Sequence, residues 1–169
     1  VFGYEHERPD YDFFGFGSTS SAKINIDSVY ALAIVKPLTG LSVTGGVRHD
    51  DHSQFGGATT FGANANYTPN VGATNVRLSY GEGFKAPTLY QLYGSFVGTP
   101  GLRPEESKSY DAAVELGDRN APLHLAASVF RRDSRNLIDF DPTLFIYGNI
   151  ARARAEGFDI SASLVDATL

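Results

Sequence analysis

Apolar residues recur at every second position in several segments of this sequence, and this alternation limits the possible folds more than any other feature. The apolar positions are Leu41, Val43 and Val47; Val76, Leu78 and Tyr80; Tyr110, Ala112, Val114 and Leu116; Leu123, Leu125, Ala127 and Val129; and Phe158, Ile160, Ala162 and Leu164. Successive side chains of a β-strand point to opposite faces, so each segment predicts a strand with one apolar and one polar face. We expect strands over residues 1–8, 24–36, 41–50, 58–68, 74–84, 108–117, 122–132 and 152–164.

The connections between these strands differ in length. Three are short and contain turn-forming proline, glycine, asparagine or aspartate, at 37–40, 69–72 and 118–121. The others are longer, at 9–23, 51–57, 85–107 and 133–151. Short turns at one end of a sheet and long loops at the other are typical of bacterial outer-membrane barrels.

Three all-β architectures fit this pattern. They are a segment of an antiparallel transmembrane β-barrel, a self-contained eight-stranded outer-membrane barrel with a structural or adhesive role, and a soluble β-sandwich. The apolar positions are lightly filled, as a lipid-facing band can be. The opposite positions carry charges that suit a wet or plugged lumen, and a transmembrane barrel is therefore favoured. These charges are Arg48, Arg77, Asp111, Glu115 and Asp159.

Composition excludes several other classes of protein. The longest apolar run, from Val29 to Val35, is far shorter than the roughly 18 residues of a transmembrane helix. The sequence contains no cysteine, so neither disulfides nor thiolate metal sites can form. A formal net charge of −5 without a clustered basic face argues against nucleic acid as a partner.

Aromatic residues in two of the long connections are candidates for ligand binding. Tyr90, Tyr93 and Phe96 lie in connection 85–107, and Tyr11 and Phe14 lie in connection 9–23. Aromatic rings on a loop can pack against a planar or hydrophobic ligand. The alternative is that these rings pack only against neighbouring loops, and the sequence leaves both possibilities open.

Neither a metal site nor a catalytic site is indicated. Carboxylates gather at Asp50 and Asp51, beside His52, and at Asp10 and Asp12, but without the regular spacing of a calcium loop. We therefore expect solvated charges there, and no bound cofactor. A serine nucleophile motif of the form Gly-x-Ser-x-Gly is absent, and we expect no enzymatic activity.

The second half of the chain resembles the late barrel of TonB-dependent outer-membrane receptors, with the cobalamin and siderophore receptors nearest. The resemblance rests on four stretches in the family's order and spacing: VRLSYGEGFKAPTLYQLYG, GTPGLRPEESKSYDAAVEL, LAASVFRRDSRNLIDF and NIARARAEGFDISASL. Several motifs in the correct order are far more specific than any one of them.

Within these stretches, three motifs imply structural roles. Proline cannot donate to a strand ladder, so Phe84-Lys85-Ala86-Pro87 predicts a corner where the chain leaves the sheet. The chain is expected to return at Leu102-Arg103-Pro104-Glu105, where Glu105 or Arg103 can form an ion pair across the rim. Gly157 belongs to the last motif, Ala-Arg-x-x-Gly-aromatic-acid.

The resemblance implies a receptor for a ferric siderophore or a corrinoid in the bacterial outer membrane. Such receptors have a barrel of 22 strands around a plug domain, and TonB acts through the plug. Residues 1–169 would be a partial barrel domain from the later middle of such a barrel, an excised piece in contact with lipid, plug and nutrient. Haem receptors of the family carry a histidine between the two corner motifs, and this sequence has none between Phe84 and Leu102. Haem ligation from this loop is thereby excluded.

Overall fold

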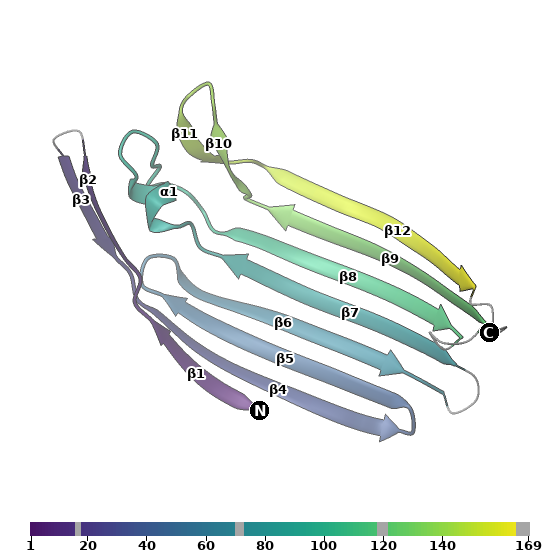
Figure 1. The fold of residues 1–169 in the computed structure, drawn as a ribbon. Coiled ribbons are helices and arrows are strands. Elements are labelled where there is room, and N and C mark those ends of the chain that lie inside the picture. Colours follow the sequence, from purple (N-terminus) through teal and green to yellow (C-terminus); the bar gives the residue numbers. More distant parts are fainter. Residues whose placement is uncertain (16–17, 70–72, 118–121, 165–169) are drawn as a thin grey trace, which may run out of the picture.

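The computed structural model describes residues 1–15, 18–69, 73–117 and 122–164. Eight of its strands form one antiparallel sheet in which neighbours follow chain order (Figure 1). The strands are β1 (Phe2–Glu7), β4 (Ile26–Leu38), β5 (Leu41–His52), β6 (Gly56–Tyr67), β7 (Thr74–Lys85), β8 (Glu105–Leu116), β9 (Leu123–Arg135) and β12 (Arg152–Leu164). Each expected strand is thus present, with ends that differ by a few residues.

The connection predicted at 51–57 is only the turn 53–55, because β5 and β6 extend into it. The other three long connections lie at the same end of the sheet, here named the loop end, and contain structure that alternation did not predict. They hold β2 (Asp10–Gly15), β3 (Ser18–Lys23), α1 (Leu89–Tyr93), β10 (Ile138–Asp141) and β11 (Ile146–Asn149). The β2–β3 and β10–β11 pairs are two-stranded hairpins that project beyond the main sheet (Figure 1). The helix begins at a capping box, because Thr88 Oγ1 accepts a bond from Gln91 N (3.2 Å) and Gln91 Oε1 accepts one from Thr88 N (2.9 Å).

The short connections lie at the opposite end, here named the turn end. Strands β4 and β5 are joined through Thr39 and Gly40, and Gly40 adopts φ +81°. The expected turn began at Pro37, but β4 continues to Leu38 across a register shift between Val35 and Leu38. Proline has no N–H to donate, which explains an irregularity there. The expected turns at 69–72 and 118–121 fall on positions 70–72 and 118–121, outside the described residues.

The register of the strands places the predicted apolar positions on a single face, the apolar face. Val47 pairs with Ala31 on one side and Phe61 on the other. Ala127 likewise pairs with Val114 and Ile160. The five predicted charges Arg48, Arg77, Asp111, Glu115 and Asp159 lie at the alternate positions, on the polar face. The predicted two-faced sheet is therefore confirmed.

The apolar face is exposed, and the buried side chains lie elsewhere. Val129 is 55% exposed and Phe158 75%, whereas Ile24, Leu89, Leu92 and Leu102, all at the loop end, are buried. A β-sandwich would cover the apolar face with a second sheet, but the other sheets of the described residues are the two-stranded hairpins. The sheet order leaves β1 and β12 at opposite edges, whereas a closed eight-stranded barrel would pair its first and last strands. Both alternatives to a segment of a larger barrel are thus disfavoured.

No helix in the described residues has the length and apolar character needed to cross a membrane.

Strands β6 and β7 separate from each other toward the loop end (Figure 1). Their pairing runs from Tyr67–Val76 only as far as Gly62–Gly81, although β7 stays paired with β8 up to Lys85–Glu105. Beyond Gly62, a side chain crosses the gap, since Phe61 N donates to Glu82 Oε2 at 3.2 Å. We refer to this gap, between residues 56–61 and 82–85, as the β6–β7 opening.

Candidate functional site

Three of the long connections meet at the loop end and form what we call the loop cluster, made of residues 9–15, 18–24, 86–104 and 136–151. Helix α1 packs against the β2–β3 hairpin and buries Leu89 and Leu92. The segment after α1 is joined to the β10–β11 hairpin by a backbone bond from Tyr147 N to Val97 O of 3.0 Å. Connections far apart in the sequence thereby become one surface.

A chain of aromatic rings runs through the loop cluster, with Tyr90 at its centre. The Tyr90 ring contacts the Tyr11 ring, with centroids 6.3 Å apart, and the Tyr147 ring, with centroids 6.2 Å apart, both edge to face. Phe140 extends the chain, since it contacts both Tyr147 (5.4 Å) and Phe145 (5.6 Å). The predicted residues Tyr11 and Tyr90 are thus brought together, and their rings pack between loops. Sequence reasoning missed Phe140 and Tyr147, since nothing in their local pattern indicates contact with α1.

Three rings of the loop cluster are largely exposed, including Phe145 at the end of this chain of rings. Phe14 is 82% exposed, Phe96 78% and Phe145 66%. Phe96 and Phe145 have φ angles of 69° and 58°, a left-handed conformation that costs a non-glycine residue roughly 1–2 kcal/mol. The predicted residues Phe14 and Phe96 therefore stand on an accessible aromatic surface, which Phe145 extends.

Tyr93, the remaining predicted ligand residue, connects α1 to the turn between β5 and β6. Its hydroxyl accepts a hydrogen bond from Gln54 Nε2 at 2.8 Å. The contact links residues 39 positions apart, and no local sequence pattern indicates a role for Gln54.

The corner motifs hold the start and the end of connection 85–107 together. Strand β7 ends at Lys85, just before Ala86 and the buried Pro87. Lys85 Nζ forms an ion pair with Glu105 Oε1 at 3.3 Å, and the same oxygen accepts a bond from Ile138 N at 3.2 Å. Leu102 is buried at this junction.

Asn149 fastens the second corner to the β10–β11 hairpin, a role that sequence reasoning missed. Its Oδ1 accepts a bond from Arg103 N (2.8 Å), and its Nδ2 donates to Arg103 O (2.9 Å) and to Asn136 O (2.7 Å). The Asn136 side chain in turn donates to Pro104 O at 3.3 Å. These bonds satisfy backbone groups where the strand ladder stops.

Gly157 gives space to an aromatic ring across the strand pair β9–β12. It pairs with Phe130, and a Cβ at position 157 would lie 2.9 Å from Phe130 Cε1. The ring thus lies over the glycine on the polar face.

Two arginines of the polar face form ion pairs with carboxylates of the same face. The Arg48 guanidinium donates to Glu5 Oε2 (2.9 Å), Asp50 Oδ1 (2.7 Å) and Ser28 Oγ (2.8 Å). Farther along the sheet, Arg77 Nη2 lies 2.5 Å from Glu115 Oε1.

The fold separates the side chains of Asp50 and Asp51, one of the carboxylate pairs considered for calcium. Asp50 is bonded to Arg48 and Ser28, whereas Asp51, one residue later, points to the apolar side. The ring of His52 is buried, and its Nδ1 accepts a bond from Gln54 N at 3.2 Å. The parts of the chain that the structure describes contain no group of three or more His, Cys, Asp or Glu side chains placed to hold a metal ion.

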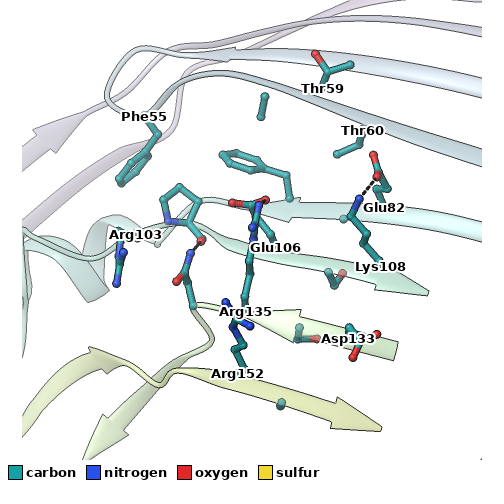
Figure 2. Close-up of a pocket in the computed structure, with 18 of the residues that line it drawn as sticks. Phe55, Thr59, Thr60, Glu82, Arg103, Glu106, Lys108, Asp133, Arg135 and Arg152 are labelled. Atoms are coloured by element: carbon teal, nitrogen blue, oxygen red, sulfur yellow. Dashed lines mark hydrogen bonds and ion pairs between the residues drawn. The ribbon is translucent and has the colours of Figure 1, made fainter. Parts of the chain in front are cut away.

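A cavity of about 1040 Å³ lies beside the corners, lined by Phe84 and Pro104 and by charged residues of β7, β8, β9 and β12 (Figure 2). It opens at the β6–β7 opening, since Thr59 and Glu82 also line it. The aromatic residues of the loop cluster are not among its lining. We name it the outer cavity.

A sequence-family model described as "TonB dependent receptor-like, beta-barrel" matches residues 2–166.

Several solved structures share the fold. The siderophore receptor PirA from Pseudomonas aeruginosa is 26% identical, with a TM-score of 0.78 over 95% of this chain and 32% of that one. A variant of the ferric enterobactin receptor PfeA from the same organism, in complex with enterobactin, is 20% identical, with a TM-score of 0.78 over 94% and 30%. The copper transporter OprC is 13% identical, with a TM-score of 0.73 over 99% and 32%. The chain therefore spans about a third of the length of these proteins.

Proposed function

The chain belongs to the TonB-dependent receptor β-barrel family, and from this membership we propose that it forms part of an outer-membrane receptor that imports a scarce nutrient with energy from TonB. In this proposal the apolar face lies against lipid, and the polar face lines the lumen and meets a plug domain. The turn end is periplasmic and the loop end extracellular. No catalytic step is assigned to the segment.

The loop cluster is the part of the segment that we propose captures the nutrient. One observation carries this assignment: Phe14, Phe96 and Phe145 are exposed around a scaffold of packed aromatic rings. A fixed aromatic surface gives a planar or hydrophobic ligand a large contact area at low entropic cost. Tyr11, Tyr90 and Tyr93 would act mainly by holding that surface in place.

A ferric siderophore or a corrinoid is the ligand class that we propose. The similarity to PirA and PfeA supports the siderophore. The fold by itself does not select the ligand, because the copper transporter OprC shares it.

Uptake by cells tests the proposal. A full-length receptor that contains this segment is expressed in a bacterial strain without competing receptors, and uptake of radiolabelled ferric enterobactin and cyanocobalamin is measured. We expect saturable uptake of one of them, and its loss when TonB is deleted. Uptake that persists without TonB would contradict the mechanism.

Substitution of the exposed rings tests the site. We expect the double substitution Phe96→Ala and Phe145→Ala to weaken binding of the imported ligand on the order of tenfold, equivalent to about 1.4 kcal/mol. The Phe61→Ala variant, which removes a ring from the apolar face, serves as the control and should bind normally. Equal affinities of all three proteins, at equal surface abundance, would remove the loop cluster from the ligand site.

A further inference from the structure

The outer cavity opens on the apolar face of the sheet, nearer the loop end than Tyr110, Val129 and Phe158. Lys108, Asp133 and Arg154 line it, and strand alternation places them on the same face as Tyr110 and Val129. Figure 2 shows that the labelled side chains of β8 and β9 converge on this space. The cavity therefore faces the surroundings of a barrel and not its lumen.

The outer cavity has an excess of positive charge. Its lining includes five cationic side chains, Arg103, Lys108, Arg135, Arg152 and Arg154, and three acidic ones, Glu82, Glu106 and Asp133. Each carboxylate is matched: Lys108 pairs with Glu82 (2.8 Å), Arg154 with Asp133 (2.6 Å), and Arg135 with Glu106.

Two guanidinium groups of the cavity, those of Arg103 and Arg152, stay without an acidic partner. Within the described residues, no carboxylate oxygen lies within 4.0 Å of either group. Guanidinium groups bind phosphate with two parallel hydrogen bonds, so two of them beside one cavity suit a phosphate group.

An apolar groove continues from the outer cavity along the same strands. It has a volume of about 630 Å³ and crosses β8, β9 and β12. Tyr110, Ala112, Val129 and Phe158 line it, together with Arg131 and Glu156 at the end nearer the outer cavity. Strand β12 extends about 20 Å from Phe158 to Arg152. For a strand tilted by 45°, this is roughly 14 Å along the membrane normal. This height is close to half of the ~30 Å hydrocarbon core of a bilayer.

We propose that the outer cavity and the groove together bind a lipid with a phosphate-bearing headgroup. Arg103 and Arg152 bind the phosphate, and an acyl chain lies in the groove against Val129 and Phe158. Free phosphate would explain the charges alone, whereas an apolar tail also accounts for the mostly apolar groove that begins beyond the ion pairs of the cavity. The site is on the opposite side of the wall from the lumen, so this proposal is independent of the nutrient.

Lipid binding to the full-length receptor in non-ionic detergent tests this proposal, with native mass spectrometry as the readout. The probes are phosphatidic acid, diacylglycerol and glycerol 3-phosphate, which carry phosphate and tail, tail alone and phosphate alone. We expect Arg103→Gln combined with Arg152→Gln to weaken phosphatidic acid binding at least tenfold. The control is Arg132→Gln, which removes a charge from the polar face of β9 and should leave binding unchanged.

The other probes separate the two parts of the site. We expect diacylglycerol to bind the wild type and the double variant alike, and weakly. Glycerol 3-phosphate should fail to displace phosphatidic acid at equal concentration. Equal binding of phosphatidic acid to the wild type and the double variant would overturn the proposal. Full displacement by glycerol 3-phosphate would also overturn it, because the site would then be one for a free anion.

Discussion

Gly40 is the residue on which the turn between β4 and β5 depends most directly. Its φ of +81° is a left-handed conformation that disfavours any side chain, and a Cβ there would collide with the carbonyl oxygen of Thr68. The Gly40 carbonyl also accepts a bond from Thr68 N at 2.8 Å. Any larger residue must therefore disturb both the β4–β5 turn and the start of the connection that follows β6.

We expect Gly40→Ala to lower the free energy of unfolding of the full-length receptor by at least about 1–2 kcal/mol, from the backbone conformation alone. Gly45→Ala is the matched control, because Gly45 has no positive φ and a Cβ there meets no atom within 4 Å. Its effect should stay within roughly 0.5 kcal/mol. Urea titration of both variants in vesicles measures the difference, and equal losses would show that the turn conformation is not limiting.

Single residues of the candidate site were predictable only in part. Tyr11, Tyr90 and Phe96 stood out because they are aromatic residues in long connections. Gln54 and Asn149 did not, since each acts through a partner that is distant in sequence, and only the folded chain brings the two together. The ion pair of Lys85 with Glu105 could be anticipated from the sequence, because the two residues belong to motifs that mark the two ends of one connection.

Among the elements, strands β6 and β7 have the least complete pairing in the eight-stranded sheet. Strand alternation directs the N–H groups of Gly57, Thr59 and Phe61 toward β7, yet the ladder with β7 begins only at Gly62. Phe61 reaches the Glu82 carboxylate instead. A backbone without ladder bonds opens at low cost in free energy.

Amide hydrogen exchange of the full-length receptor measures this opening. We expect Thr59 to exchange on the order of tenfold faster or more than Ala63 and Ala65, which pair with β7, because each 1.4 kcal/mol of protection is a factor of ten. The Glu82→Ala variant should speed exchange at Phe61 and leave Ala63 unchanged. Equal protection of Thr59 and Ala63 would mean that β6 and β7 pair over their whole length.

The eight long strands were predictable because a period of two persists over about ten residues in the clearest of them. Helix α1 was not, since its five residues are too few to display a helical period. The hairpins β2–β3 and β10–β11 were not predictable either, because strands of four to six residues are too short to show a clear alternation. Their positions depend on packing against α1 and the corners, which no local pattern encodes.

For the whole molecule, the decisive property is the difference between the two faces of the sheet. Ala126 and Ala127 show it at adjacent positions. Ala127 lies among Val114 and Ile160 on the apolar face, and Ala126 lies beside Glu115 and Ser161 on the polar face.

This difference predicts opposite tolerance for charge. We expect Ala127→Arg to destabilise the folded receptor in vesicles by about 2–4 kcal/mol, the cost of a cation in the middle of the lipid. Ala126→Arg, the same substitution one residue away, should cost far less because its side chain meets water and a carboxylate. Reversible urea unfolding compares the two variants, and equal losses would contradict the assignment of the apolar face to lipid.

The chain-order arrangement of the sheet bears on how such a receptor can diversify. Within the described residues, each strand of the eight-stranded sheet pairs only with its neighbours in sheet order, and the connections that contain a helix or a hairpin leave from the loop end. Evolution can therefore change one connection without altering the order of the strands. The strands themselves require only that their apolar positions stay apolar. The sequences of the strands and of the connections can then change independently of each other. This independence accounts for an architecture shared with a copper transporter at 13% identity.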